Sequence, residues 1–297
     1  MGGVIMKKIK VALCYSGAVR GLINNLPQIH DVLFNEEIYE IDYYLYADPN
    51  GGTVHAEDVA KGKIEPQGLK VQKELPYFNC LLESELDGFR ERKERFYENI
   101  LDYHMPYEQQ IHQWYGVKRV FEFVFSQEKE YDVYVRLRCD LYPAGKMKFD
   151  WDKFDANTVY VPFNCPFGGI NDRFAFGSKN AMKIYSNFYD SDIYYSSASK
   201  DGASEQKGIA WYEKNYQHIP TDNFGNQRKN SEYRLLNYLF DKDLEIELLP
   251  PENLSIAAVR NSAGIIRYGG PEVEELLFRH NQAKLEDLKY HKKPWWR

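Results

Sequence analysis

The residues best suited to chemistry are charged side chains within an otherwise apolar segment, residues 131–143 (YDVYVRLRCDLYP). Its Tyr and Val content and its alternating polarity predict a β-strand. On that strand Arg136, Arg138 and Asp140 share one face, and aliphatic residues occupy the other. Burying such charges costs free energy unless they are paired or bound to a ligand. The segment therefore predicts either an internal Arg–Asp ion pair or a strand that brings charge to a pocket for an anionic ligand.

A short loop near the start of the chain is a second candidate for anion binding. Residues 8–15 are a near-continuous apolar run, which predicts a buried first strand of an α/β sheet. Ser16, Gly17 and Arg20 follow it, before a helix-like segment. Free N–H groups at a helix start bind anions, and Arg20 would add a planar donor for phosphate. The loop lacks the GxGxxG and Walker spacings, so a plain strand-to-helix turn is the alternative.

Three further carboxylates stand where they could contact a substrate. Asp48 follows a second predicted strand, residues 41–47, where a carboxylate can bind a ribose hydroxyl or a base edge. Asp172 precedes a predicted strand at 173–177 and could act as a general base if it faces a pocket. Glu232 lies in the first turn of a predicted helix. The structural alternatives are turn chemistry for Asp48, capping of its own loop for Asp172 and the helix dipole for Glu232.

The remaining pattern supplies the elements that would position these side chains. Further strands are predicted at 69–75, 158–162 and 244–249. Helices are predicted up to about residue 34, at 83–103, at 107–127, from a cap at Ser178 to 189, from a cap at Ser231, and after residue 270. The Ser-rich stretch 191–208 is predicted to be a loop, followed by a helical turn or two at 209–216. With 297 residues, the chain can form one large α/β domain or two smaller ones.

Composition argues against several classes of protein. The net charge of −6 disfavours a nucleic-acid-binding protein, which would usually be basic. The four cysteines are far apart and form no CxxC pair, which leaves a zinc or redox motif unsupported and fits a reducing compartment. We expect no signal peptide and no transmembrane segment, because no run approaches about 20 apolar residues. The expected location is cytoplasmic, with any membrane contact peripheral.

Taken in order, these motifs resemble GT-A-type glycosyltransferases, a group that includes polysaccharide and glycan-building transferases of bacteria and large viruses. The shared pattern is SG-x-x-R after a strand, a strand ending in Asp, YD-x-x-x-R-x-R-x-D, ND-x-F-x-F/Y-G and a helix opening with S-E. The matching positions in this chain are residues 16–20, Asp48, residues 131–140, residues 171–177 and residues 231–232. The matching pieces are scattered over about residues 8–240.

The resemblance implies a GT-A-like, Rossmann-like α/β fold with a mixed, mostly parallel central sheet flanked by helices. It implies a single domain over residues 1–297, with a nucleotide-sugar-binding half at about 1–145. The acceptor-binding half and the C-terminal helix would occupy about 146–297. The expected ligands are a nucleotide-diphosphate sugar, most often linked to uridine diphosphate in this family, and a glycan or polysaccharide acceptor. The expected activity is hexosyl or pentosyl transfer.

The resemblance also assigns roles to single positions. Asp140 stands at the end of the family's Asp-x-Asp motif, which contacts a divalent cation (Mn²⁺ or Mg²⁺) or the donor sugar. Arg138 replaces the first Asp of that motif, and an arginine can itself neutralise a leaving diphosphate by bidentate hydrogen bonding. Other candidates for this charge are Arg20, Arg136, Arg260 and Arg267.

The remaining roles concern the nucleotide and the acceptor. Ser16, Gly17 and Asp48 would bind the nucleotide. If transfer inverts the anomeric centre, a carboxylate must deprotonate the acceptor hydroxyl. Asp172 is the first candidate for this base and Glu232 the second.

Two other functions fit parts of the sequence. A sugar nucleotidyltransferase or a sulfotransferase also handles activated phosphates, although SGAVRG is a poor match to the Gly-rich loop usual in nucleotidyltransferases. A non-catalytic glycan- or nucleotide-binding protein is suggested by the 15% aromatic content and the incomplete Asp-x-Asp motif. Pyrophosphate release would favour the first, and donor binding without transfer would favour the second.

Overall fold

The computed structural model describes about three fifths of the chain in several stretches. The described residues are 7–17, 19, 22–29, 33–34, 37–49, 67–83, 94, 107–143, 147–163, 169–191, 194, 202–216, 231–254, 256–259 and 266–267. Arg20, Arg260, most of the predicted helix at 83–103 and the predicted C-terminal helix lie outside them.

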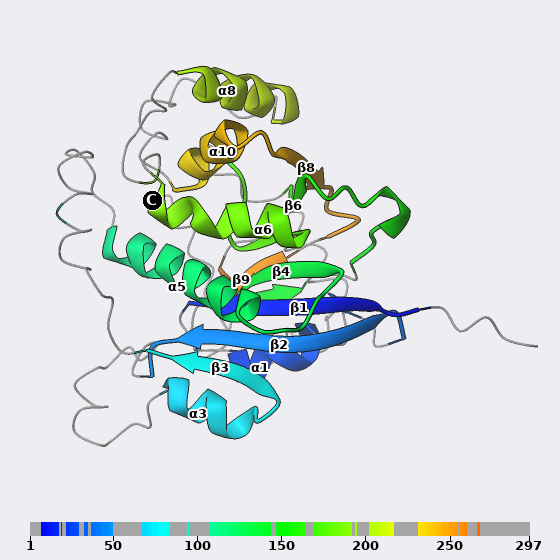
Figure 1. Ribbon diagram of the computed structural model, residues 1–297, viewed down its shortest axis with the longest axis vertical. Coiled ribbons are helices and arrows are strands. Elements are labelled where there is room, and N and C mark those ends of the chain that lie inside the picture. The colour runs from blue at the N-terminus through cyan, green and yellow to red at the C-terminus, as the bar shows by residue number, and fades with distance from the viewer. Residues whose placement is uncertain are drawn as a thin grey trace, which may run out of the picture.

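A seven-stranded sheet in the order β3-β2-β1-β4-β7-β6-β8 forms the centre of the molecule (Figure 1). Its strands are β1 (Ile9–Ser16), β2 (Tyr39–Ala47), β3 (Phe78–Leu82), β4 (Val133–Arg138), β6 (Thr158–Pro162), β7 (Phe174–Gly177) and β8 (Glu245–Leu249). β3, β2, β1 and β4 run parallel, β7 is antiparallel to both neighbours, and β8 is parallel to β6. The predicted α/β fold with a mixed, mostly parallel sheet is confirmed.

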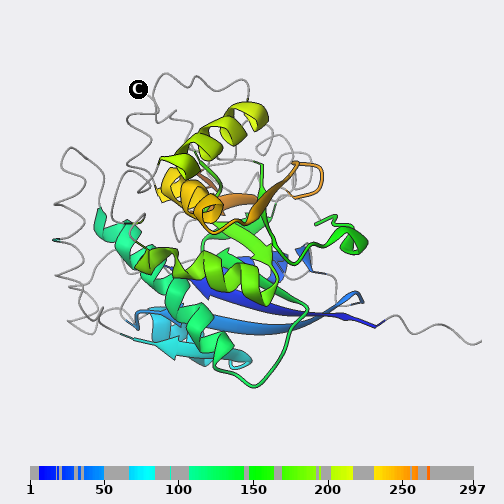
Figure 2. The same cartoon turned by 45° about the horizontal axis from the view of Figure 1, so that its top comes forward.

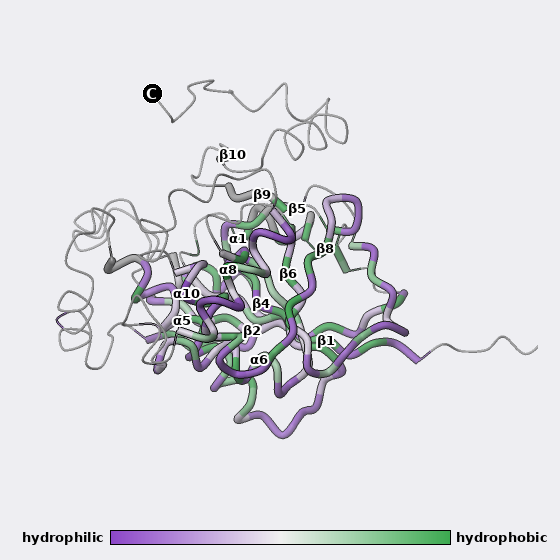
Figure 3. Tube along the Cα trace, turned by 90° about the horizontal axis from the view of Figure 1, so that it is seen from above, coloured by the Kyte–Doolittle hydropathy of each residue, from purple (hydrophilic) through white to green (hydrophobic). Residues whose placement is uncertain are grey.

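Helices cover both faces of this sheet, as the turned view in Figure 2 also shows. They are α1 (Leu22–Gln28), α3 (Gln67–Glu74), α5 (Tyr107–Phe125), α6 (Lys179–Ser186), α8 (Ala203–Asn215) and α10 (Ser231–Asp241), with 3₁₀ turns at Trp151–Lys153 and Asn187–Asp190. In Figure 3 hydrophobic residues run along the strands, and hydrophilic ones gather in the outer turns. Within the described ranges, no helix is long and apolar enough to cross a membrane.

The two faces of the sheet hold separate cores, and the connections change face beside β1. Leu26 of α1 and Val71 of α3 pack with Leu13 of β1 on one face. Trp114 of α5 packs with Cys14 of β1 on the opposite face. The connections from β1 to β3 therefore pass on one face, and the connection from β3 to β4 passes on the other. Ligands of open α/β sheets bind at such a switch point, beyond the carboxyl ends of the strands.

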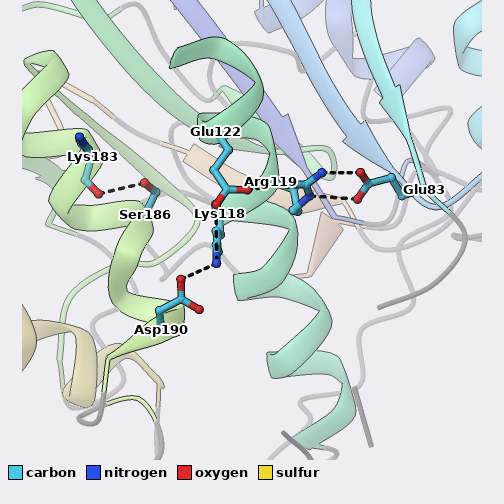
Figure 4. Close-up of polar contacts among 7 residues, drawn as sticks. All are labelled: Glu83, Lys118, Arg119, Glu122, Lys183, Ser186 and Asp190. Atoms are coloured by element: carbon cyan, nitrogen blue, oxygen red, sulfur yellow. Dashed lines mark hydrogen bonds and ion pairs between the residues drawn. The ribbon is translucent and has the colours of Figure 1, made fainter. Parts of the chain in front are cut away.

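Ion pairs attach α5 to its surroundings, as the close-up in Figure 4 shows. Arg119 donates to both oxygens of Glu83, just after β3, at 3.0 and 2.5 Å. Lys118 pairs with Asp190 at the end of the 3₁₀ turn that follows α6. These partly exposed pairs contribute little stability each, but they fix α5 against both the sheet edge and α6.

The prediction of one continuous strand over residues 131–143 is wrong. β4 ends at Arg138, the chain turns at Cys139 and Asp140, and β5 (Leu141–Pro143) enters a second sheet. That sheet is antiparallel, in the order β10-β9-β5, with β9 at Ile256–Val259 and β10 at Ile266–Arg267. The partner of β5 lies more than a hundred residues away, so local alternation could not reveal the break.

Two further segments differ from prediction. The predicted strand at 69–75 lies in helix α3: Val71 and Leu75 are buried with helical spacing, while Leu69 is exposed, and the strand β3 after it was missed. Residues 203–208 belong to α8 and not to a loop. The buried positions of α8 are Ser204, Gly208 and Tyr212. Because this buried face is small and polar, the apolar signal of a helix is weak there.

The other described elements agree with prediction within a few residues at each end. They are the strands β1, β2, β6, β7 and β8, and the helices α5, α6 and α10. The predicted cap of α6 is confirmed, because the backbone N–H of Ala181 donates to Ser178 Oγ at 3.1 Å.

Removing this cap tests how α6 is held. Ser178→Ala loses the bond from Ala181 and a second bond from Ser178 Oγ to the Ala156 carbonyl at 2.6 Å. We expect the free energy of unfolding to fall by about 1 kcal/mol, measured by urea denaturation. Ser178→Thr keeps the hydroxyl and is the matched control. Equal losses in both variants would contradict the cap assignment.

Candidate functional site

A bidentate ion pair lies at the carboxyl end of β4. Arg138 Nε donates to Asp140 Oδ1 at 2.9 Å, and Arg138 Nη2 donates to Asp140 Oδ2 at 2.5 Å. The two side chains are 16% and 10% exposed, so solvent still reaches them. Burial lowers the pKa of Arg138, but the Asp140, Asp172 and Glu232 carboxyl groups outweigh it and raise the pKa above its ordinary value. Arg138 therefore remains a cation at the carboxyl end of β4.

The loop before β7 is attached to β4 by one backbone carbonyl. The Arg173 carbonyl oxygen accepts from the Arg138 backbone N–H and from Arg136 Nη1, both at 3.0 Å. The Arg173 N–H donates to Asn171 Oδ1 at 2.8 Å, which closes an Asx turn around Asp172. Because β7 is antiparallel to β4, its amino end and this loop lie beside the carboxyl end of β4.

The start of α10 approaches the same loop closely. The Ile170 N–H donates to the Glu232 carbonyl at 3.3 Å. A Cβ on Gly169 would lie 2.1 Å from the Glu232 carbonyl carbon, so only glycine permits this approach. The first turn of α10 is therefore held against the loop that carries Asp172.

Asp172 is almost fully buried, at 4% exposure, and side chains from two helices hold it. Gln113 Nε2 of α5 donates to Asp172 Oδ2 at 2.5 Å. Ser231 Oγ of α10 lies 3.4 Å from the same oxygen. Both contacts use Oδ2. Among the residues that the structure describes, none makes a hydrogen bond to Oδ1.

Glu232 lies next to Asp172 and differs from it electrostatically. Ser231 Oγ lies 3.1 Å from Glu232 Oε2, so the hydroxyl stands between the two carboxyl groups. Burial, and then the charge of Asp172, raise the pKa of Glu232 above its usual range, to about 8. Glu232 therefore holds a proton more tightly than an ordinary carboxyl group.

Arg136 is buried completely, in contrast to Arg138. Its guanidinium group makes one hydrogen bond among the described residues, to the Arg173 carbonyl, and its Nε and Nη2 atoms have no partner there. Burial lowers the pKa of Arg136, while Tyr185 and Asp172 act in the opposite direction. The structure thus places Arg136 beneath the loop of Asp172, where it holds the backbone and faces the carboxylate.

The other predicted binding residues in the described ranges lie at the carboxyl ends of neighbouring strands. Ser16 ends β1 opposite Arg138 of β4, and its buried hydroxyl has no hydrogen-bond partner among the described residues. Gly17 follows with a φ of +112°, a conformation that favours glycine. Asp48 follows β2, one strand farther from β4, and no described contact joins it to the Asp172 cluster. Arg20 lies outside the described residues.

The donor atoms in this cluster do not fit a protein-bound divalent cation. Both oxygens of Asp140, the residue that the resemblance assigns to a metal, accept from Arg138. No group of three or more His, Cys, Asp or Glu side chains able to hold a metal occurs within the described ranges. A protein-bound divalent cation needs several oxygen or nitrogen ligands, whereas Asp140 is paired with Arg138 and Asp172 accepts from Gln113.

The structure brings three residues to the site that the sequence did not single out. Gln113 contacts Asp172 directly, Tyr185 of α6 lies near Arg136, and the carbonyl of Arg173 links the loop to β4. Gln113 and Tyr185 belong to predicted helices. The sequence alone does not show which side of each helix faces the site, because this depends on the order of the strands. Only Arg173, inside the ND-x-F segment, carried a signal in the sequence.

No protein-family model and no curated protein matches the sequence, and the following solved structures are distantly similar to it. Apo mouse xyloside xylosyltransferase 1 is similar with a TM-score of 0.37 and 9% identity, over 82% of this chain and 85% of that chain. The apo glycosyltransferase GlyE of Streptococcus pneumoniae TIGR4 has a TM-score of 0.32 and 15% identity, over 82% of this chain and 45% of that chain. An active-site mutant of LgtC has a TM-score of 0.33 and 9% identity, over 78% and 69%. Likenesses this low carry no inference about activity.

The raised pKa of Glu232 predicts a pH-dependent stability. The folded protein binds this proton more tightly than the unfolded chain, so this group destabilises the fold as pH rises from about 5 to about 8. Glu232→Gln cannot ionise. We expect its melting temperature, relative to wild type, to rise across that range in thermal unfolding experiments.

The matched control is Glu213→Gln, on the exposed face of α8. Its melting temperature should follow that of wild type at every pH. A Glu232→Gln variant that also follows wild type would show that Glu232 is ionised in the folded protein at neutral pH.

Proposed function

We propose that this protein is a glycosyltransferase that moves a sugar from a nucleotide-diphosphate sugar to a glycan or polysaccharide acceptor. The observation that supports this most is the meeting of Arg138 and Asp172 at the carboxyl ends of β1 and β4. The guanidinium group suits a leaving diphosphate, and the carboxylate suits an acceptor hydroxyl. The Arg173 carbonyl bonds to the Arg138 N–H at 3.0 Å, so the two groups belong to one rigid unit.

Arg138 would stabilise the departing diphosphate. Its pair with Asp140 uses Nε and Nη2, so Nη1 points outside the pair. As the bond between the anomeric carbon and the diphosphate oxygen breaks, negative charge grows on that oxygen, and a preorganised cation lowers the barrier. Asp140 would hold the guanidinium in place. Because these residues do not fit a metal site, no step here is assigned to a cation other than arginine.

Asp172 would act as the general base. In a displacement with inversion it takes the proton of the acceptor hydroxyl while the oxygen attacks the anomeric carbon. Asp172 is preferred over Glu232, because burial and the charge of Asp172 raise the pKa of Glu232, so that Glu232 holds a proton more tightly than an ordinary carboxyl. The β1 loop with Ser16 and Gly17, together with Asp48, would bind the nucleotide, and uridine diphosphate is the carrier to test first. The acceptor would then bind the second half of the chain.

A thermal-shift panel of nucleoside diphosphates and nucleotide sugars, each with and without Mn²⁺ or Mg²⁺, tests the donor class. A ligand at about 100 times its dissociation constant should stabilise the fold by about 2.7 kcal/mol. We expect one nucleotide sugar to stand out. If none raises the melting temperature, the Arg138–Asp140 pair is structural and the proposal fails.

Arg138→Gln tests the diphosphate contact. Losing a charge-assisted hydrogen bond should raise the dissociation constant of the selected nucleoside diphosphate about 10- to 100-fold, measured by calorimetry. The control is Lys179→Gln, which breaks an ion pair with Glu130 at 2.7 Å. This pair lies at the amino end of β4, away from Arg138. Unchanged affinity in Arg138→Gln would remove this residue from the donor site.

Asp172→Asn tests the base. We expect kcat for sugar transfer to fall by about 10²–10⁴ while the donor-induced thermal shift remains. Asp190→Asn, which breaks the surface ion pair with Lys118, should keep full activity. Donor binding without transfer in wild type, with every acceptor tried, would favour a non-catalytic binding protein.

A further inference from the structure

We propose that Gln113 is a positioning residue that holds one oxygen of Asp172 and thereby assigns proton transfer to the other oxygen. Nothing in the sequence motifs points to Gln113, since it lies in the middle of helix α5 and outside every matched segment. The inference rests on the proposed function, because it takes Asp172 as the base. It adds the direction from which the acceptor hydroxyl must approach.

Both side-chain contacts of the Asp172 carboxylate are made to the same oxygen, Oδ2. Gln113 Nε2 donates to Oδ2 at 2.5 Å, and Ser231 Oγ lies 3.4 Å from the same atom. No hydrogen bond to Oδ1 comes from any residue in the described part of the chain. The two lone pairs of Oδ2 face the Gln113 N–H and the Ser231 hydroxyl, so a proton arriving at Oδ2 would displace one of these donors. The proton of an acceptor hydroxyl therefore goes to Oδ1.

The backbone of Asp172 is fixed independently of Gln113. Arg136 and Arg138 bond to the carbonyl of the next residue, and Asn171 bonds to its N–H. The loop also contacts the first turn of α10 through Ile170. With the main chain held from β4 and α10, the remaining freedom of Asp172 is rotation of its side chain. Gln113, from the third element α5, removes that freedom.

An amide suits this position better than a charged group. It donates to the ionised carboxylate and so favours the form that can accept a proton. It does not titrate, so it leaves the charge of the site unchanged over the working pH range. A lysine or arginine would pair with Asp172 and weaken it as a base, and a carboxylic acid would compete for its proton.

The reaction then proceeds as a single displacement. The acceptor O–H bond breaks and its proton moves to Asp172 Oδ1, while the acceptor oxygen bonds to the anomeric carbon. The bond from that carbon to the diphosphate breaks, and its electron pair stays on the diphosphate beside Arg138. A proton leaves and a proton is accepted, so charge and atoms balance with no further reactant.

The test uses Gln113→Leu and the donor selected by the thermal-shift panel, with transfer to acceptor or water as the assay. We expect kcat to fall about 10- to 100-fold, because a base displaced by about 1 Å loses this much. The KM for the donor should change less than about twofold. The acidic limb of the kcat profile should move to higher pH, because an N–H donor that favours the ionised base is gone.

Gln113→Glu keeps the shape and separates positioning from packing. While protonated, the introduced carboxyl can still donate to Asp172, so activity should persist at acidic pH. It should fall at higher pH, where the introduced group ionises beside Asp172 and repels it. Wild type should lack such a fall below about pH 8, where Glu232 itself ionises. Gln127→Leu, just beyond the end of α5, removes a glutamine bond to the Phe123 carbonyl at 3.0 Å and is the matched control.

The outcomes separate this inference from the proposed function. If the donor binds and Asp172→Asn is inactive, but Gln113→Leu keeps the wild-type kcat and pH profile, Gln113 does not position the base. If Gln113→Leu loses the donor-induced thermal shift, or Gln113→Glu shows no alkaline fall, the role of Gln113 is structural and the inference is overturned. If no donor binds wild type, it is the proposed function that fails.

Discussion

The candidate site depends on one backbone atom, the carbonyl oxygen of Arg173. It accepts hydrogen bonds from the Arg138 N–H and from the Arg136 guanidinium, both at 3.0 Å. The first bond extends the β4–β7 ladder by one residue beyond its last pair. The second uses a fully buried charge, whose desolvation is costly unless it is compensated. Together they place the Asp172 carboxylate within the field of two arginines at the switch point of the sheet.

The charges around this atom nearly cancel, and the remainder suits an anion. Three guanidinium groups, those of Arg136, Arg138 and Arg173, stand against the carboxyl groups of Asp140, Asp172 and Glu232. Because the pKa of Glu232 is raised, less negative charge stands against the three guanidinium groups. The two alternatives predicted for residues 131–143, an internal Arg–Asp ion pair and a site for an anionic ligand, are therefore compatible. Arg138 pairs with Asp140 and still has a nitrogen outside the pair.

Much of this arrangement could be predicted from the sequence, because the strands are apolar and their ends are polar. The alternation in β4 assigned Arg136 and Arg138 to one face, and the cap at Ser178 marked the start of α6. Local pattern could not show that the chain turns at Asp140, or that Gln113 reaches Asp172. Both follow from long-range contacts, β5 with β9 and α5 with the loop before β7. Local patterns indicate which residues are buried, and tertiary pairing decides which of them meet.

Two carboxyl groups share one serine, and their surroundings give them different chemistry. The single hydrogen of Ser231 Oγ can go to Asp172 or to Glu232, which lie 3.4 and 3.1 Å away. With Glu232 protonated, its own O–H can donate to Ser231 Oγ, and the serine hydrogen is then directed to Asp172 Oδ2. Asp172 Oδ2 then accepts from two donors, Ser231 and Gln113, while burial and the charge of Asp172 raise the pKa of Glu232. Environments that differ in this way between two neighbouring acids support the proposed role of Asp172 as the base.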